Sequence, residues 1–343
     1  MTTTALRINA FGPLTNPDNL TLDLITLPEP GPHEVLVELY AASLNYRDLM
    51  TVLGTYNPKM PLPRIPGSDA AGVVTAIGSH VTRFAVGDHV TSLFFQDWHD
   101  GPIQPTTGKS ALGGPIDGVF STEHLFPETG LIHSPAGYTH AEAATLPCSA
   151  LTAWNALVEK GHISAGQTVL ILGTGGVSLF ALQIAKAHGA RVILTSSSDE
   201  KLAHGRTLGA DETINYRTTP DWDREVFKLT NKRGVDHIVE VGGAGTLPRS
   251  LNAVTPGGHI YLIGVLSGKG EGVDPTPILA KAIHLDGVYV GSSGMRARLN
   301  AAIEANHIHP VIDRTFPLTQ AHEAFAHMQS GSHFGKIVLT LRD

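Results

Sequence analysis

The stretch that decides the fold runs Val169-Leu-Ile-Leu-Gly-Thr-Gly-Gly-Val-Ser178. A short apolar strand leads directly into a glycine cluster, and residues with helical spacing follow at once. Glycines at 173, 175 and 176 permit a tight turn, let backbone N–H groups approach a diphosphate, and place a helix N-terminus beside it. Ser178 takes the third position of this fingerprint and is small enough for close helix–strand packing. The alternative is an ordinary glycine-rich turn in a parallel sheet. The glycine cluster stands between a strand and a helix, however, and this position favours a dinucleotide site.

Strand and helix patterns alternate on the C-terminal side of this turn. The expected strands cover residues 169–172, 191–195, 235–241, 259–264 and 285–291, and the expected helices cover 179–188 and 200–208. Such βα units predict an α/β fold with a doubly wound parallel sheet and helices on both faces.

The two ends of the chain have a different character from this middle part. The N-terminal part is β-rich, with strands expected at residues 34–41, 71–78 and 88–95. A long irregular loop over residues 96–118 and helical spacing over 140–160 follow. The tail predicts a helix at 320–328 and a final strand at 336–341. We therefore expect a second, β-rich domain beside the parallel sheet.

Composition limits the class of protein. The 343 residues, 42% hydrophobic, are enough for two domains with substantial cores. A net charge of −7 gives no electrostatic footprint for nucleic acid, and no apolar run is long enough to span a membrane. The N-terminus lacks the pattern of a secretory signal, and the single Cys148 excludes an intramolecular disulfide framework. We expect a soluble, cytoplasmic protein without nucleic-acid or membrane partners.

The end of the second predicted strand indicates which dinucleotide binds. An NAD site places an acid there, whereas this chain has Thr195 and Ser196. An acid would oppose a 2′-phosphate by about 4 kcal/mol at 4 Å and an effective dielectric constant of 20. Hydroxyl groups with Lys201 nearby would favour that phosphate, which predicts NADP(H). In the alternative interpretation, Ser197 and Glu200 form a capping box for the next helix and Lys201 is only a solvated side chain.

Several further motifs occur in an order that resembles the medium-chain dehydrogenase/reductase superfamily. With the glycine turn, they are Asn45-x-x-Asp48, Pro66-Gly-Ser-Asp-Ala-Ala-Gly72, Val86-Gly-Asp-His-Val90, Leu146-Pro-Cys-Ser-Ala-Leu-Thr-Ala-Trp154 and Gly335-Lys-Ile-Val338. The resemblance covers nearly the whole chain. It implies a GroES-like catalytic domain formed from both chain ends, a Rossmann domain, and a homodimer or tetramer, of which we expect the homodimer. The expected division is 1–130 for the GroES-like domain, 131–290 for the Rossmann domain and 291–343 for the return to the catalytic domain.

Departures from the family pattern concern zinc. Zinc-dependent members carry Cys where this chain has Asn45, and Gly-His-Glu where it has Gly67-Ser-Asp69. They also carry four structural cysteines that residues 90–115 lack here. Cys148 alone makes a poor catalytic zinc site, which needs three protein ligands. Replacement ligands are a weaker alternative: His89, His99 and His124. The chain thus resembles the zinc-free branch, which includes quinone oxidoreductases and enoyl reductases, and we expect no metal.

Chemistry without zinc favours conjugated acceptors. Hydride adds at carbon, and the negative charge spreads into an enolate or hydroquinone anion that oriented hydrogen-bond donors stabilise. The expected activity is NADPH-dependent reduction of an enone-type C=C bond or a quinone. A metal-free alcohol dehydrogenase or carbonyl reductase and a non-catalytic NADPH-binding protein are the alternatives. The predicted catalytic donors are Asn45, Tyr56 and Thr152; alternatively, they cap a turn, pack locally and cap a helix, respectively.

The remaining cofactor contacts come from strand ends and from the resemblance. By likeness to the family, the stretches at 264–265 and 290–292 hold the nicotinamide carboxamide, and Tyr216 lies near the 2′-phosphate. The predicted cofactor-binding residues are Cys148, Gly173, Gly175, Gly176, Val177, Ser196, Ser197, Lys201, Tyr216, Gly242, Gly264, Val265, Val290 and Ser292. The aromatic residues Phe94, Phe95 and Trp98 line a substrate cleft or belong to an ordinary core.

Overall fold

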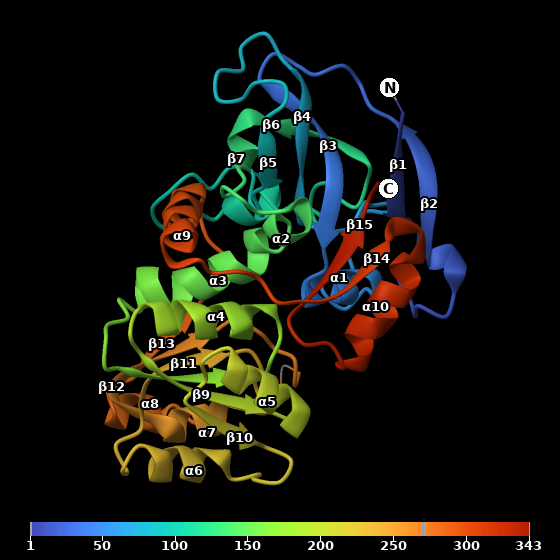
Figure 1. Cartoon of the computed structure of the whole chain (residues 1–343). Coiled ribbons are helices and arrows are strands. Elements are labelled where there is room, and N and C mark those ends of the chain that lie inside the picture. Colours follow the sequence, from blue (N-terminus) through green and yellow to red (C-terminus); the bar gives the residue numbers. More distant parts are fainter. Residues whose placement is uncertain (1, 269, 271, 343) are drawn as a thin grey trace. The chain divides into compact units, whose positions relative to one another are not determined.

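The computed structural model describes residues 2–268, 270 and 272–342. It divides into two compact units (Figure 1). The first combines Met1–Leu151 with Gly291–Asp343, and the second is Thr152–Val290.

The second unit contains a six-stranded, fully parallel sheet in the order β10-β9-β8-β11-β12-β13. The strands are β8 (Thr168–Leu172), β9 (Arg191–Ser196), β10 (Glu212–Asn215), β11 (Val235–Glu240), β12 (Val254–Leu262) and β13 (His284–Gly287). The central strands β8 and β11 are buried along their whole length, as expected for a parallel sheet covered on both faces. The strand order reverses between β8 and β11, and ligands of such sheets bind beyond the carboxyl ends of the strands at this point.

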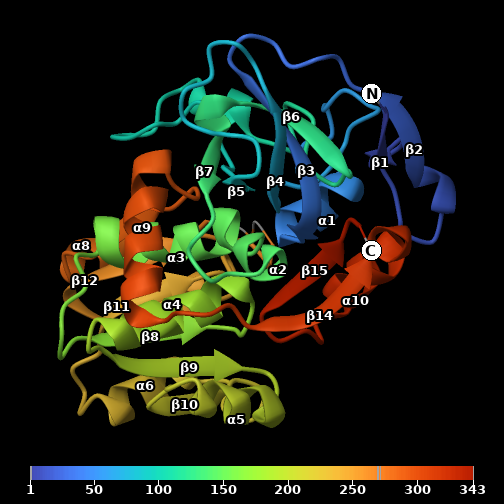
Figure 2. The ribbon, with the colours of Figure 1, turned by 45° about the horizontal axis from the view of Figure 1, so that its top comes forward.

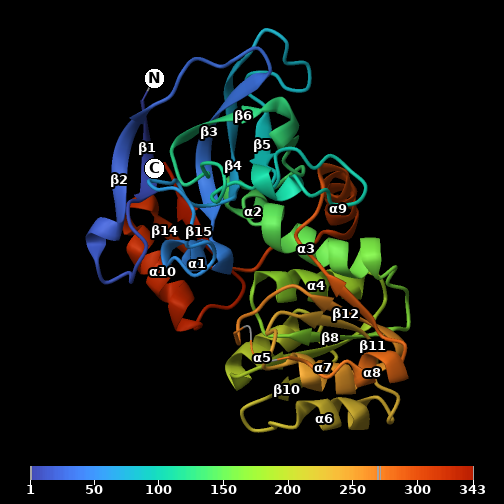
Figure 3. The same cartoon turned by 180° about the vertical axis from the view of Figure 1, so that it is seen from behind.

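Helices connect these parallel strands. They are α4 (Gly176–Ala187), α5 (Asp199–Thr207), α6 (Trp222–Leu229), α7 (Leu247–Ala253) and α8 (Thr276–Ala280). Right-handed crossovers place α4 and α5 on one face, and α6, α7 and α8 on the other after the order reverses (Figure 3). Apolar residues such as Leu170, Ile193 and Ile238 form the core beneath these helices.

The first unit is built on a seven-stranded, mostly antiparallel sheet in the order β14-β15-β3-β4-β5-β7, with β6 also paired to β3. The strands are β3 (Glu34–Ser43), β4 (Asp69–Ile77), β5 (His89–Ser92), β6 (Glu123–Pro127), β7 (Leu131–His133), β14 (Ile312–Pro317) and β15 (Lys336–Thr340). A separate antiparallel pair joins β1 (Thr2–Ile8) to β2 (Leu20–Thr26). Because β15 pairs with β3, with Val338 opposite Ser43, both ends of the chain complete one sheet (Figure 2).

The first unit contains four α-helices in the described ranges, and a helical run over residues 146–160 leads into the second unit. They are α1 (Tyr46–Val52), α2 (His140–Ala143), α9 (Ser293–Asn306) and α10 (Ala321–Ser330). The run consists of a π-helical segment (Leu146–Ala150), α3 (Leu151–Trp154) and a second π-helical segment (Asn155–Lys160). Short 3₁₀ turns occur at Pro17–Asn19, Thr107–Ser110, Glu128–Gly130 and Leu318–Gln320. No helix in the described ranges is long and apolar enough to cross a membrane.

Two expectations about boundaries need correction. The structure places residues 131–151 in the first unit, not with the parallel sheet, because β7 pairs with β5. The strand expected over 285–291 ends at Gly287, because Val290 has the left-handed backbone angle φ +54° and cannot continue a strand. In the loop over 96–118, the short turn at Thr107–Ser110 is flanked by isolated bridges.

Candidate active site and nucleotide site

The glycine turn has the geometry that a diphosphate requires. Gly173 adopts φ +75°, which favours glycine, and Gly175 precedes α4 without any side-chain cap for the first N–H groups of the helix. A methyl group at Gly175 would contact no described atom within 4 Å, so this side of the turn is open. The Ser178 hydroxyl donates to the Leu172 carbonyl at 2.8 Å and ties the helix to the strand. Together with Gly176 and Val177 at the start of α4, these residues fit an anionic ligand.

Hydroxyl and basic residues gather where β9 and β10 end. Ser196 ends β9, and its carbonyl accepts a hydrogen bond from the Tyr216 N–H at 3.0 Å. Helix α5 begins after Ser198, whose hydroxyl accepts from the Lys201 N–H at 3.3 Å. The capping role considered for Ser197 is therefore wrong, because the helix starts one residue later. Ser197 and Lys201 thus lie at the same strand end as Tyr216.

The nearest acidic residue at this strand end is turned toward another partner. Asp199 accepts a hydrogen bond from the Asn215 side chain at 2.7 Å. The Asn215 oxygen in turn accepts from the Arg217 N–H at 3.0 Å. The Asp199 carboxylate is therefore held against the end of β10.

Glu240 shapes the loop after β11 and escaped the sequence analysis. Its fully buried carboxylate accepts hydrogen bonds from the N–H groups of Gly242 at 2.8 Å and Gly243 at 3.1 Å. The hydroxyls of Thr246 and Ser250 also donate to it, at 2.6 and 2.5 Å. The sequence feature that could have indicated this role is an acidic residue at the end of an otherwise buried strand. Glu240 thus fixes the backbone at the predicted contact Gly242.

The loops after β12 and β13 contain the other predicted contacts. A Cβ atom at Gly264 would lie 2.4 Å from the Val241 carbonyl oxygen, so only glycine fits there, and the neighbouring Val265 is largely exposed. Val290 is buried, and the Asn155 side-chain NH₂ donates to its carbonyl at 2.7 Å. Ser292 lies in the first unit, where its hydroxyl caps α9 by accepting from the Met295 N–H at 3.2 Å. The Ser292 hydroxyl is thus engaged in capping α9, and its predicted contact with the cofactor stays a prediction.

A second cluster forms around Asn45 in the first unit. Asn45 precedes α1, and its N–H donates to the Asp48 carboxylate at 2.8 Å. Its side-chain oxygen accepts from the Lys336 ammonium at 2.7 Å and from the Ser149 hydroxyl at 3.4 Å, and its NH₂ donates to Ser68 Oγ at 3.4 Å. Asn45 is therefore the centre of a buried network, and its side chain does more than cap a turn.

The network continues to Cys148 through Asp69. The Ser68 hydroxyl donates to one oxygen of Asp69 at 2.6 Å, and the Cys148 N–H donates to the other at 3.0 Å. Burial, reinforced by the Asp69 charge, raises the pKa of the Cys148 thiol to about 12. Burial also lowers the pKa of Lys336, which donates to the Leu44 carbonyl at 2.7 Å besides Asn45. In the sequence, Lys336 stands out only as part of the motif Gly335-Lys-Ile-Val338, and no local pattern indicates its place in this cluster.

This donor set does not suit zinc. In the described ranges, no three His, Cys, Asp or Glu side chains are grouped so that they could hold a metal ion. The network offers a single thiol, that of Cys148, and the Lys336 ammonium that donates to the Asn45 oxygen brings a positive charge that opposes a second cation. The histidines considered as replacements have other neighbours: His89 contacts His140, and His124 packs against Phe126.

The other two predicted donors are not among the hydrogen-bond partners described for the Asn45 side chain. Tyr56 is 38% exposed and contacts Arg47, whose guanidinium carbon lies 5.9 Å from the Tyr56 ring centroid. Arg47 itself is buried against Phe94 and donates to the Leu112 carbonyl. Thr152 is buried in the second unit. The helical run passes through Thr152 from residue 146 to 160, so its suggested role as a helix cap is wrong.

The aromatic residues before the long loop belong to the core. Phe94, Phe95 and Trp98 are all buried. Phe95 contacts Phe94 and Trp98 edge to face, with ring centroids 4.8 and 5.7 Å apart. The structure therefore supports the ordinary core interpretation for this group.

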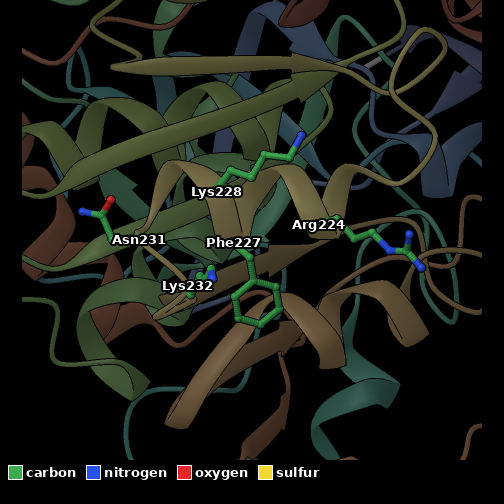
Figure 4. A pocket seen from close by; sticks show the side chains of 5 residues that line it. All are labelled: Arg224, Phe227, Lys228, Asn231 and Lys232. Atoms are coloured by element: carbon green, nitrogen blue, oxygen red, sulfur yellow. The ribbon is translucent and has the colours of Figure 1, made fainter.

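A hollow of about 530 Å³ lies on the outer helix layer of the second unit (Figure 4). Its lining residues are Arg224, Phe227, Lys228, Asn231 and Lys232. Lys228 is paired with Glu225 at 2.6 Å, and Arg224 lies 4.0 Å from Asp221. This hollow contains none of the predicted site residues, so it is not the candidate nucleotide site.

Comparison with known proteins agrees with this architecture. Residues 31–136 match the alcohol dehydrogenase GroES-like domain family, and residues 176–305 match the zinc-binding dehydrogenase family. A zinc-type alcohol dehydrogenase-like protein of Schizosaccharomyces pombe is 43% identical over 98% of this chain and 99% of its own length. Human quinone oxidoreductase is 30% identical over 98% of this chain and 97% of its own length.

Solved structures show the same fold. One, described as an alcohol dehydrogenase from Sinorhizobium meliloti, has a TM-score of 0.90 and 43% identity, and covers 99% of this chain and 98% of its own. Another, described as an NAD-dependent alcohol dehydrogenase, has a TM-score of 0.89 and 34% identity, covering 99% and 100%. These matches confirm the GroES-like and Rossmann architecture. The chain belongs to the medium-chain dehydrogenase/reductase superfamily.

Proposed function

We propose that this oxidoreductase is a zinc-independent, NADP(H)-dependent reductase of conjugated C=C bonds or quinones. The observation that carries the proposal is the bond from the Lys336 ammonium to the Asn45 side chain. A thiolate occupies the position of Asn45 in zinc-dependent relatives. In this chain the position holds the Asn45 amide, and the Lys336 ammonium lies next to it. This positive charge favours a substrate that becomes negatively charged and disfavours a bound metal cation.

Two sets of residues in this chain would take part in such a reaction: one would bind the cofactor, and the other would donate hydrogen bonds to the substrate. The nicotinamide, when bound, supplies the hydride to the acceptor carbon. The open turn at Gly175 and the N-terminus of α4 would hold the diphosphate. The acceptor becomes anionic, and we assign Asn45 and Thr152, with Tyr56, as donors to the developing oxyanion. Lys336 strengthens the Asn45 amide as a donor by bonding its oxygen.

The preference for NADP(H) rests on the strand ends of β9 and β10. Thr195 and Ser196 stand where an NAD site carries an acid, Ser197 and Lys201 follow them, and Asp199 is engaged by Asn215. One similar structure is described as NAD-dependent, so the two nucleotides must be compared directly. Titration of the purified protein with NADPH and NADH should give tighter binding of NADPH. Tighter binding of NADH would overturn this preference.

One experiment tests the reaction. Enones, quinones and aldehydes are screened by following NADPH oxidation, with metal analysis of the same sample and sedimentation to test the expected homodimer. We expect saturated ketones from enones and no stoichiometric zinc. An allylic alcohol as product would indicate a carbonyl reductase, and nucleotide binding without turnover would indicate a non-catalytic homologue. Stoichiometric zinc would overturn the mechanism.

A further inference from the structure

Val290 has a backbone conformation that its side chain disfavours. Its φ of +54° lies in the left-handed region, although valine is branched at Cβ and buried. It follows β13, at the edge of the sheet where ligands bind. Strained residues of this kind persist only where the surroundings impose them, and they cluster at functional sites.

The Asn155 side chain holds the Val290 carbonyl by a hydrogen bond. Its NH₂ group donates to the Val290 carbonyl at 2.7 Å across 135 residues of sequence. A carbonyl can only accept, so this contact also fixes the orientation of the Asn155 amide. The side-chain oxygen of Asn155 is buried and has no hydrogen-bond partner among the described residues. The pair therefore combines a strained backbone with a half-satisfied buried amide, and neither favours stability.

The position of Asn155 links this pair to the candidate active site. It is the first residue of the π-helical segment Asn155–Lys160, and such segments are frequent at functional sites. Thr152, a candidate donor, lies three residues earlier on the same helical run, and both side chains are buried. Residues at this spacing share one side of a helix. One helical run thus carries a candidate donor and the residue that holds Val290.

We propose that Asn155 is a positioning residue for the nicotinamide end of the cofactor. Its NH₂ group keeps Val290 left-handed, so that the backbone of residue 290 presents the carboxamide contact. This inference rests on the proposed function, since it requires that a nicotinamide nucleotide binds. It adds a residue, outside the glycine turn and the Asn45 network, that selects the orientation of the nicotinamide ring.

The test compares a whole nucleotide with a fragment that lacks nicotinamide. Asn155→Leu should weaken binding of the oxidised dinucleotide about 10-fold, the effect of losing roughly one hydrogen bond. The control ligand is the ADP-ribose part of the same dinucleotide, with the 2′-phosphate if NADPH is preferred. Its dissociation constant should change less than about two-fold. Both affinities are measured by calorimetry, with the thermal midpoint as a check on folding. An equal loss for both ligands, or no loss for either, would overturn the inference.

A second variant separates positioning from damage to the fold. Glycine adopts the left-handed region without strain, so adding Val290→Gly to Asn155→Leu should restore part of the dinucleotide affinity. Lack of any recovery would count against the proposal. The hydride should also be transferred with lower facial selectivity in Asn155→Leu than in the unchanged protein. If the unchanged protein binds neither dinucleotide, the proposed function fails, independently of Asn155.

Discussion

Lys336 and Asn45 are 291 positions apart in the chain, yet the Lys336 ammonium donates a 2.7 Å hydrogen bond to the Asn45 side-chain oxygen. The contact forms because β15 pairs with β3, directly before Asn45. Two segments that are remote in sequence therefore define the environment of one candidate donor.

Replacing Lys336 tests that environment. We expect Lys336→Met to lower turnover at least about 10-fold, because the Asn45 amide loses the charge-assisted bond to its oxygen. Nucleotide affinity should change less than turnover, since the glycine turn belongs to the other unit. Steady-state kinetics and nucleotide titration on the same preparation measure the two effects. Unchanged turnover with every accepted substrate would remove Lys336 from the mechanism.

Gly175→Ala tests whether the open side of the turn receives the diphosphate. The new methyl group contacts no described atom within 4 Å, so the thermal midpoint should hardly move. Nucleotide affinity should fall by roughly 10-fold or more, because the methyl group occupies the approach of the phosphates. Gly108→Ala is a matched control in a similarly open position. Equal affinities in the two variants would contradict this assignment.

Ser197→Asp should reverse or reduce the preference for NADPH. An added carboxylate beside the expected 2′-phosphate repels it, and partial exposure to solvent limits the effect to roughly 10-fold. NADH binding should be unaffected or tighter. Competitive titrations with both nucleotides measure this, with Thr218→Asp as a surface control. Equal weakening of both nucleotides would place Ser197 elsewhere in the site.

Cys148 should react slowly with alkylating agents in the native protein. Its pKa is raised from 9.0 to about 12, so almost no thiolate exists at pH 8. The unfolded chain releases this proton at lower pH, so Cys148 also makes unfolding more favourable as the pH rises from 9 toward 12. Mass spectrometry of iodoacetamide labelling, with and without denaturant, tests the expectation. Rapid labelling of the native protein at pH 8 would contradict it.

One buried and one half-buried histidine should make the protein sensitive to acid. Burial lowers the pKa of both His124 and His237 from 6.5 to about 4. Between these pH values the unfolded chain binds protons that the folded protein does not, so stability falls as the pH drops from 6.5 toward 4. His237 lies between Tyr261 and Gln167, at 2.8 and 3.0 Å.

The matching variant is His237→Gln, which keeps a polar group but cannot titrate. Denaturant unfolding at pH 7 and pH 5 should show a smaller loss of stability in this variant than in the unchanged protein. An identical loss in both would show that His237 does not contribute to the acid sensitivity.

The sequence was most informative where local patterns decide the structure. The apolar run before Gly173 predicts β8 and the turn, because a buried parallel strand and a glycine cluster both leave a clear local signature. The residues that were missed act through distant contacts. Asn155 matters only because Val290 lies beside it, and Lys336 only because β15 reaches Asn45. The cap of α5 is Ser198 and not Ser197 as considered from the sequence. This shift of one residue decides which serine hydroxyl caps the helix and which one is left for the predicted contact with the cofactor.

The pairing of β15 with β3 also has a consequence for how the chain is assembled during synthesis. The second unit is one continuous stretch, Thr152–Val290, and its strands can all pair as soon as that stretch has emerged. The sheet of the first unit is completed later, because β3 can pair with β4 and β6 early but gains β15, and Asn45 gains the Lys336 ammonium, only when the residues from 336 onward arrive. Synthesis that ends shortly before that point would therefore give a chain with every strand of the parallel sheet present and the Asn45 network incomplete.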